Sequence, residues 1–449
     1  MTGGPLRGPS PTSRQARTPA PGAKGLFYGW WIVAAGGAVQ WYTSAVFWRG
    51  FQAFFDPIVQ TFNWSRGATA GAVSLQRSES GLISPFVGTV LEKFGPRRAM
   101  AFGMAVTGAA FIVMSFVQSL WQFYLAMALM TVGMSFGTFI VIVATVGNWF
   151  VRKRGKALSV LMAASAIGGF TLPLLVFSID HFGWRHVLLA VGTGFWVVGL
   201  PAIFIMRRRP EEYGQLPDGG AVAGQSQAAH GGQEPNVRVR DALKLRFFWQ
   251  LSLATSLGQL VSSTNLLHLP ALKQFGVSPG LAAAAAGSVA FGDLAGRLLV
   301  GWVGERYDKR LLLTGAFSLQ TLGMIGFTLV NLDVGPFTIS PAVTLPVFVA
   351  GFGLGFGASI PVRLSILADY FGRKSYGSVL GMTSSVSAGF GALGPVFAGA
   401  MYDFTDSYRP AFAVLTVALA ASIPLSLTLE SQSRVAAKAR LRASGKTLP

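Results

Sequence analysis

The chain is built from apolar blocks that are long enough to cross a lipid bilayer, separated by short polar segments. About 20 apolar residues of α-helix span a hydrocarbon core of about 30 Å. Lipid offers no hydrogen bonds to the backbone, so each block must be helical. We therefore expect an all-α membrane protein with twelve transmembrane helices, at 28–54, 66–91, 99–118, 121–147, 156–179, 185–206, 247–269, 280–303, 311–331, 342–367, 376–401 and 409–429.

The composition favours a membrane protein and excludes several other classes. Only 12% of the residues are charged, whereas a soluble domain has about 25%. The absence of cysteine excludes disulfides and thiolate chemistry, and the four histidines lack metal-ligand spacing. With no catalytic motif in the sequence, we expect no metal, no cofactor and no enzyme activity. The net charge is +19, and the Lys and Arg residues that carry it lie mostly between the apolar blocks. This distribution indicates membrane topology and not a nucleic-acid partner.

The distribution of charge predicts orientation and domain boundaries. Lys and Arg cluster in alternate loops and in both terminal segments, so both termini are expected in the cytoplasm, with the protein in the plasma membrane or bacterial inner membrane. Residues 1–25 are rich in Pro, Gly, Ser and Arg and predict a disordered cytoplasmic tail, not a signal peptide. The polar, Gly-rich segment 207–246 predicts a flexible cytoplasmic linker between six-helix bundles at 26–206 and 247–429, with a basic cytoplasmic tail at 430–449.

Short polar motifs of the first half recur in the second half at a nearly constant separation. GTVLEKFGPRR at 88–98 pairs with GWVGERYDKR at 301–310, and WFVRK at 149–153 pairs with YFGRK at 370–374. Random apolar sequence would not keep such motifs in register. A duplicated six-helix unit implies two bundles around a central cavity near the bilayer midplane, and transport by rocking one bundle against the other.

The motif at 88–98 resembles the cytoplasmic signature of the major facilitator superfamily, G-x-x-x-[D/E]-[R/K]-x-G-x-[R/K]-[R/K]. The resemblance implies that fold, together with a charge network that closes the cytoplasmic side. The residues expected in this cytoplasmic gate are Glu92, Lys93, Arg97 and Arg98, with Glu305 and Arg306 from the degenerate second copy.

A narrower resemblance, to monocarboxylate transporters and oxalate/formate antiporters, covers nearly the whole chain outside the tails and the linker. The motifs that carry it are Tyr28-Gly29-Trp30-Trp31 in the first block, Trp149-Phe150 with Lys153-Arg154, and the pair Asp293 and Arg297. The resemblance implies transport of a small organic anion, with Arg297 and Asp293 at the centre of the site.

The same resemblance implies two further substrate-binding residues and one restriction. Arg49 falls where these families carry a lysine near the outer gate, and Phe356 aligns with an aromatic residue that shapes their substrate site. Ile360 stands where a small hydroxyl residue is found. The lysine of oxalate/formate antiporters has no counterpart within 376–401, which weighs against a dianion such as oxalate.

Ionisable residues inside membrane spans are costly and usually functional. Asp293 and Arg297 are four residues apart, so they share one helix face. A guanidinium grips a carboxylate bidentately, which makes Arg297 the expected substrate anchor. Protonation of Asp293 would then free Arg297 for the substrate anion and couple transport to the proton. The alternative is a structural ion pair that locks two helices.

The other intramembrane polar residues leave more than one interpretation. Arg49 either receives anions or extends to the interface, and Arg363 could add a second positive site that favours a substrate with several polar groups. His268 and Asn265 either line the cavity or form interfacial hydrogen bonds. Arg77 and Glu79 of the second block need partners on other helices, and Arg363 is a candidate partner for Glu79. Structural pairing is the simpler interpretation for both residues.

The sequence thus predicts a secondary transporter that moves a small organic anion, most simply a monocarboxylate, with the proton as coupling ion. Alternatives within transport are an organic-anion antiporter of the oxalate/formate type and an exporter of a neutral metabolite or drug. A signalling receptor on the same scaffold is a further alternative. The expected partners are the substrate, the proton and the lipid bilayer.

Overall fold

A computed structural model describes residues 27–48, 50–64, 83–219, 239–373 and 375–430. The described chain is almost entirely helical, apart from one small hairpin formed by β1 (Asp333–Val334) and β2 (Phe337–Thr338). The helices of the first half are α1 (Tyr28–Thr43), the π-helix η1 (Ser44–Trp48), α2 (Gln52–Phe62), a helix over 83–94, α4 (Pro96–Ser115), α5 (Leu120–Gly137), α6 (Phe139–Trp149), α7 (Arg154–Gly168), η2 (Gly169–Thr171), α8 (Leu172–Phe182) and α9 (Trp184–Ile205).

Short helices occur in the connecting segment and longer ones follow it. The former are η3 (Pro210–Tyr213), η4 (Pro217–Gly219) and α11 (Val239–Ala242). The latter are α12 (Arg246–Ser262), α13 (Asn265–Gln274), α14 (Pro279–Val303), α15 (Lys309–Thr328), α16 (Pro341–Phe371), α17 (Tyr376–Thr405), α18 (Tyr408–Ala420) and α19 (Ser422–Leu427).

Nine helices within the described ranges are long and apolar enough to cross a membrane. The predicted blocks missing from this number are those at 28–54, 66–91 and 247–269. The first is divided into α1, η1 and α2, and the third breaks between α12 and α13. Most of the block at 66–91 lies outside the described residues. A π-helical turn inside a membrane helix often marks a functional position.

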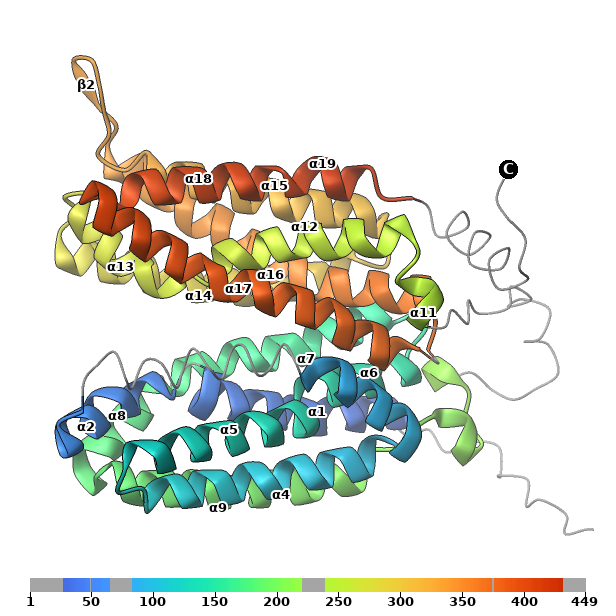
Figure 1. Ribbon diagram of the computed structural model, residues 1–449. Coiled ribbons are helices and arrows are strands. Elements are labelled where there is room, and N and C mark those ends of the chain that lie inside the picture. Colours follow the sequence, from blue (N-terminus) through green and yellow to red (C-terminus); the bar gives the residue numbers. More distant parts are fainter. Residues whose placement is uncertain (1–26, 49, 65–82, 220–238, 374, 431–449) are drawn as a thin grey trace, which may run out of the picture.

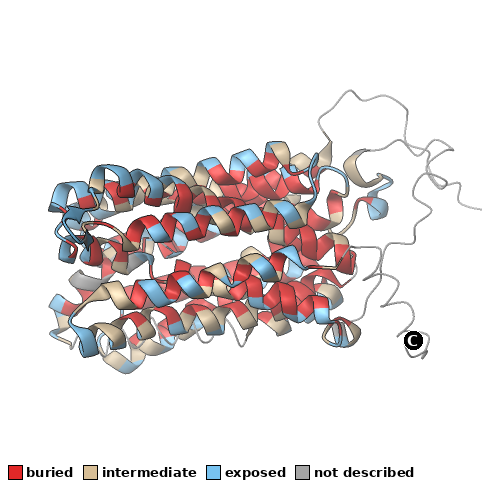
Figure 2. Cartoon of the chain, turned by 90° about the horizontal axis from the view of Figure 1, so that it is seen from above, coloured by how far each residue is buried: buried red, intermediate tan, exposed pale blue. Residues whose placement is uncertain are grey.

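The helices form two bundles that lie side by side (Figure 1). The blue and green helices α1 to α9 make one, which we call the N-bundle, and the yellow to red helices α12 to α19 make the other, the C-bundle. Buried residues gather inside each bundle, while exposed positions follow the outer faces (Figure 2). Many of these exposed residues are large and apolar, such as Trp302, Val197 and Leu174, as expected for faces that contact lipid.

Equivalent glycines hold equivalent helices together in the two bundles. A Cβ added to Gly103 of α4 would lie 2.1 Å from the backbone nitrogen of Gly137 on α5. In the C-bundle, a Cβ on Gly323 of α15 would lie 2.1 Å from the backbone nitrogen of Phe352 on α16. Such contacts let helix backbones touch, which is how membrane helices pack tightly. The same contact at corresponding places agrees with the internal repeat.

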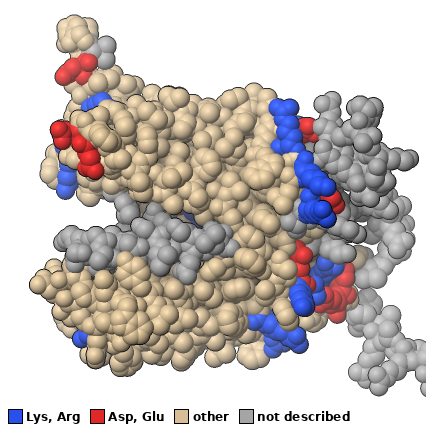
Figure 3. Space-filling view, in the orientation of Figure 1, with Lys and Arg blue, Asp and Glu red and all other residues tan. Residues whose placement is uncertain are grey.

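Charged side chains gather at the two ends of the molecule and leave a broad uncharged band between them (Figure 3). One end contains the loops at 93–98, 149–156, 207–219, 305–310 and 369–376, which carry most of the loop arginines and lysines, and we call it the basic end. The hairpin of β1 and β2 projects from the opposite end (Figure 1). A band of apolar surface between charged ends fits a membrane-spanning protein.

The domain boundaries given above stay predictions, but the first part of the predicted linker is packed against the bundles. Trp149 donates a hydrogen bond from Nε1 to the carbonyl of Arg207 over 2.9 Å. The Arg207 guanidinium in turn stacks on the rings of Tyr28 and Tyr213. Residues 207–219 therefore follow a defined path along the basic end, whereas residues 220–238 lie outside the described ranges.

Candidate substrate and coupling site

Asp293 and Arg297 form a bidentate ion pair on α14. Arg297 donates from Nε to Asp293 Oδ1 over 2.6 Å and from Nη2 to Asp293 Oδ2 over 3.0 Å. The two residues are only 1% and 5% exposed. Helix α16 packs directly against this position, since a Cβ on Gly357 would lie 2.0 Å from the Asp293 carbonyl oxygen. The spacing of four residues predicted the shared helix face, and the structure brings the two groups together as expected.

Arg297 also reaches across to the N-bundle. Its Nη1 donates a hydrogen bond of 2.6 Å to the backbone carbonyl of Met162 on α7. The two helices are close enough there that a Cβ on Gly301 of α14 would lie 2.7 Å from Cβ of Ser159 on α7. The ion pair is therefore buried where the two bundles meet. No sequence pattern predicts this hydrogen bond between Arg297 and the opposite bundle.

Arg363 lies on α16 beside two small cavities, and Phe356 and Ile360 line one of them with it. The described residues make no hydrogen bond or ion pair with its guanidinium, in contrast to Arg297. The two cavities have a mixed lining. The other apolar side chains are those of Leu251, Phe317, Leu367 and Leu380, and the polar ones are those of Thr255, Gln259, Ser262, Gln320, Ser359, Thr383, Ser384 and Ser387. Phe356 and Arg363, each expected in the substrate site, line the same cavity, and their substrate-binding roles stay predictions.

His268 and Asn265 do not line the two cavities beside Arg363. His268 is 2% exposed and its ring contacts the rings of Phe327, Phe348, Phe352 and Phe412. Its Nε2 has no hydrogen-bond partner among the described residues. Asn265 is exposed at the first turn of α13. Neither lines the cavities beside Arg363, so their assignment to the substrate site stays a prediction that this geometry does not support.

The remaining intramembrane charges lie outside the described residues. These are Arg49, for which an outer-gate role was predicted, and Arg77 and Glu79 of the second block. Their predicted roles therefore stay predictions, including the pairing of Glu79 with Arg363.

Glu92 of the predicted gate joins the two bundles at the basic end. Ser378 of α17 donates a hydrogen bond to Glu92 Oε1 over 2.6 Å, and Arg208 donates to the Glu92 backbone carbonyl. The helix over 83–94 and α17 touch closely, because a Cβ on Gly88 would lie 2.4 Å from Cα of Ser378. The signature motif thus supplies both a charged group and a glycine to this contact.

The other five predicted gate residues form no ion pair with a described residue. Lys93 lies over the ring of Phe94, Arg97 over Phe204 and Arg306 over Trp302, as cation–π contacts. Arg98 and Glu305 are exposed. These side chains contact neighbouring aromatic rings or solvent, and their gate function stays a prediction.

Three ion pairs that sequence reasoning missed lie at the basic end. Asp369 on α16 pairs with Arg154 of α7 over 2.7 Å and also with Lys309 of α15. Arg373 pairs with Glu211 over 2.6 Å. Asp369 directly precedes the motif YFGRK at 370–374, so the repeat alignment could have pointed to it. Its partners could not be read from sequence, because they lie on helices far apart in the chain.

Asp218 adds a contact between the connecting segment and the loop before α7. Its carboxylate accepts hydrogen bonds from the backbone N–H groups of Val151, Arg152 and Lys153 over 3.0, 2.7 and 3.1 Å. Three N–H donors around one carboxylate make a favourable anion environment. The segment expected to be a flexible linker therefore fixes the loop that begins α7.

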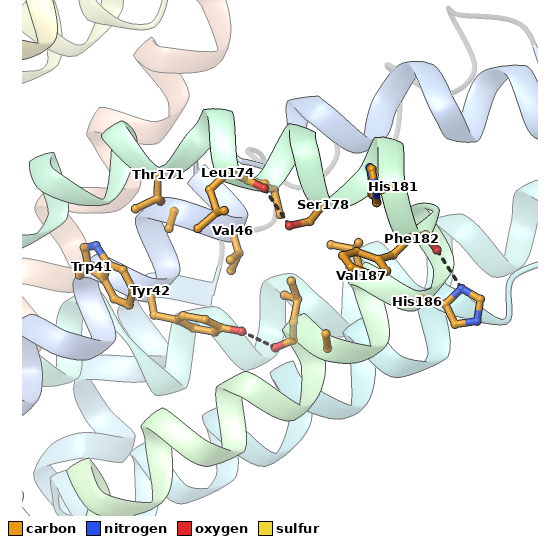
Figure 4. A pocket seen from close by; sticks show the side chains of 14 residues that line it. Trp41, Tyr42, Val46, Thr171, Leu174, Ser178, His181, Phe182, His186 and Val187 are labelled. Carbon is orange, nitrogen blue, oxygen red and sulfur yellow. Dashed lines mark hydrogen bonds between the residues drawn. The ribbon is translucent and has the colours of Figure 1, made fainter.

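A further cavity has a lining without any of these charged residues. It has a volume of about 810 Å³ and is lined by residues of α1, η1, η2, α8 and α9 only (Figure 4). Leu174 and Phe182 are among its exposed apolar lining residues. Within the described ranges, the N-bundle thus supplies every residue that lines this cavity.

Two helical bundles with buried charges where they meet form the architecture of a membrane transporter. Residues 30–359 match the Major Facilitator Superfamily, and the chain belongs to this superfamily. Monocarboxylate transporter 13 of Bos taurus is 25% identical over 409 residues, which cover 90% of this chain and 89% of that protein.

Two further comparisons extend this picture. The membrane sensor protein UhpC of Salmonella typhimurium is 26% identical over 279 residues, covering 58% of this chain and 63% of that protein. The crystal structure of the human organic anion transporter MFSD10 (TETRAN) matches with a TM-score of 0.64 at 15% identity, covering 89% of this chain and 99% of that chain. The predicted fold class and the resemblance to monocarboxylate transporters are confirmed, and the chain is an integral membrane protein of transport function.

Proposed function

We propose that this transporter couples the movement of a small organic anion, most simply a monocarboxylate, to the movement of a proton. The observation that carries the proposal is the buried pair of Asp293 and Arg297 where the bundles meet. A buried ion pair without function is expensive in lipid, and removing either partner leaves an uncompensated charge. Ionisable residues buried at membrane depth usually have a functional role, and for this pair we propose binding of the substrate and the proton.

The geometry of the pair gives a simple coupling scheme. Asp293 occupies Nε and Nη2 of Arg297, which are the two donors that would bind a substrate carboxylate bidentately. When Asp293 takes up a proton, it loses its charge and its hold on these donors. The substrate anion then replaces it, so that proton and anion bind together and the site stays neutral.

The hydrogen bond to Met162 links this exchange to the bundle interface. Arg297 holds the Met162 carbonyl on α7 from its place on α14. If the guanidinium turns toward a substrate, this bond between the bundles is lost. Substrate binding thereby favours the alternative arrangement of the bundles, because a ligand shifts a conformational equilibrium by its differential affinity for the two states.

Uptake into proteoliposomes with and without an imposed pH gradient tests the proposal. Arg297→Ala should abolish uptake of radiolabelled carboxylates. Asp293→Asn should lose proton-driven accumulation while it keeps downhill exchange. Arg240, which is exposed on α11, provides a control through Arg240→Ala. Full proton-driven uptake by Asp293→Asn would contradict the coupling role.

Two alternatives give different results in the same assay. An antiporter would need anion on the opposite side of the membrane and would not respond to the pH gradient. A sensor, which the similarity to UhpC favours as a second candidate, would bind anions without moving them. We also place the basic end in the cytoplasm, as expected for a plasma or bacterial inner membrane, on the charge distribution alone.

A further inference from the structure

Inside the C-bundle, a buried polar site surrounds Arg363 and uses groups that the coupling scheme leaves out. Helices α12, α15 and α16 line one of the two cavities beside Arg363, and α17 contributes to the other. Arg363 lines both cavities, so it joins them. Among the described residues, none forms an ion pair or hydrogen bond with its guanidinium, which lines both cavities. A cation in this position attracts an anionic ligand.

Gln320 supplies a second unsatisfied group to the same cavity. It is 1% exposed, and its Nε2 donates to Ser262 Oγ over 3.1 Å. The Ser262 hydroxyl gives its own proton to the Gly258 carbonyl over 2.8 Å. Ser262 must therefore accept the hydrogen bond from Gln320, which fixes the NH₂ group of the amide toward Ser262. Gln320 Oε1 is left as a buried acceptor with no partner among the described residues.

The described hydroxyl groups around this cavity do not donate a hydrogen bond to Gln320 Oε1. Thr255 donates to the carbonyls of Leu251 and Ser252, and Ser359 donates to the carbonyl of Phe356. Each hydroxyl proton is thus committed to the backbone of its own helix. Gln259 lines the cavity as well, and its amide makes no hydrogen bond to a described residue. The available groups are therefore one cation and two amides.

The volume of the site shows that this conformation excludes a substrate. Each of the two cavities measures about 10 Å³, which is room for about one water molecule. A three-carbon acid could enter only if the helices that line the cavity separate. The site belongs to the closed state of a cycle in which another state admits the ligand.

We propose that this site selects hydroxylated carboxylates over alkyl carboxylates: Arg297 binds the carboxylate, Arg363 adds a second positive charge that attracts the anion, and Gln320 and Gln259 bond the substrate hydroxyls. The inference rests on the proposed function and deepens it by naming the substrate class. A site with unpaired buried polar groups rejects an analogue that lacks the matching groups, because the protein groups then stay unsatisfied.

Three acids with the same carbon skeleton and zero, one or two hydroxyl groups test this inference: propionate, lactate and glycerate. The measurement is competition of each acid against a labelled carboxylate in proteoliposomes. The wild type should prefer glycerate over propionate by about 10-fold or more, with lactate between them. In Gln320→Met, which keeps the size and removes the acceptor, the preference should fall at least several-fold. Gln259→Leu should reduce it as well.

Matched controls keep the outcomes distinct. Thr321→Val changes a buried neighbour on α15 whose hydroxyl bonds the Phe317 carbonyl, and it should keep the wild-type preference. Arg363→Gln should weaken all three acids together, whereas Arg363→Lys should restore part of the affinity. The preference is the ratio of the affinities for two acids measured on the same variant. A smaller amount of folded protein therefore leaves this ratio unchanged.

Two results would overturn the inference. Equal affinity of the wild type for the three acids would remove the hydroxyl selectivity and leave the anion transporter intact. An unchanged preference in Gln320→Met and Gln259→Leu would remove these residues from the site. If the wild type neither binds nor moves any of the three acids, the proposed function fails together with the inference.

Discussion

Arg154 at the start of α7 and Asp369 near the end of α16 are joined by an ion pair of 2.7 Å between Nη1 and Oδ1, which links the N-bundle to the C-bundle at the basic end. Arg154 is almost fully buried, and its other donors reach the carbonyls of Phe150 and Gly147 over 3.0 Å each. Lys309 approaches the second oxygen of Asp369. One carboxylate therefore holds a cation from each bundle.

Removing this carboxylate should favour opening of the basic end. Asp369→Asn leaves the Arg154 cation buried without its counter-ion, which should weaken the closed state by about 1–3 kcal/mol, less than for a fully buried pair because Asp369 is partly exposed. The chain has no native cysteine, so a single cysteine at Asn148 can report the change. We expect faster labelling of Asn148→Cys by a membrane-impermeant maleimide in the Asp369→Asn background.

The control for this experiment is Asp403→Asn, because Asp403 is exposed near the far end of α17. Equal labelling rates in the Asp369→Asn and control backgrounds would show that the ion pair does not hold the basic end closed.

Gly88 should tolerate no side chain while the bundles are closed. A Cβ there would lie 2.4 Å from Cα and 2.6 Å from the backbone nitrogen of Ser378, and backbone atoms cannot move aside as a flexible side chain does. Gly88→Ala should therefore separate the helix over 83–94 from α17 and slow transport several-fold. The comparison is Gly389→Ala on α17, where a Cβ meets no atom within 4 Å.

Initial rates of uptake by the two alanine variants check this expectation. Wild-type rates for both would mean that the close contact at Gly88 has no part in the transport cycle.

Asp218 should protect the loop before α7 from proteolysis. Its carboxylate binds three backbone N–H groups, and Asp218→Ala removes all three bonds at a cost of about 1–3 kcal/mol. Trypsin should then cut faster after Arg152 and Lys153, which mass spectrometry of the fragments can identify. Glu212→Ala alters an exposed acidic residue of the same segment and should leave the cleavage rates unchanged. Unaltered cleavage in Asp218→Ala would indicate that other contacts hold this loop.

Asp308 should stabilise the start of α15 in a pH-dependent way. It caps the helix by accepting from the backbone N–H of Arg310, and hydrogen bonding from the Arg310 side chain lowers the pKa of the Asp308 carboxyl below its ordinary value. A lowered folded pKa means that the stabilisation is present above the unfolded pKa and is lost as the pH falls through the folded pKa.

Asp308→Ala should therefore lower stability by about 1 kcal/mol at pH 7, as for loss of an N-cap. Thermal unfolding in detergent at pH 7, 5 and 3 measures the difference between wild type and variant. The difference should shrink as the pH approaches 3, and a constant difference across this range would show that the carboxylate charge contributes nothing.

Sequence reasoning found the site residues that share one helix and missed the contacts between distant helices. Asp293 and Arg297 were found from sequence because they share one helix, where a spacing of four fixes their relation. Asp369 was missed because its ion-pair partner Arg154 is 215 residues away in the chain. His268 has a sequence context that suits a cavity, yet the aromatic rings of α15, α16 and α18 enclose it.

The sequence by itself indicated the apolar blocks, nine of which are long spanning helices in the described ranges, together with the internal repeat, the family resemblance and the charged pair on α14. The blocks, the repeat and the pair follow from hydropathy, periodicity and spacing, which are local properties of a chain in lipid, and the family resemblance follows from the motif at 88–98. Only the tertiary structure decided that Arg297 bonds the Met162 carbonyl of the other bundle and that Asp369 joins the bundles. It also decided that Gln320 lines a cavity with Arg363, where its Oε1 has no hydrogen-bond partner among the described residues. Such contacts depend on how distant helices pack, and packing is set by side-chain shape across the whole bundle and not by any segment alone.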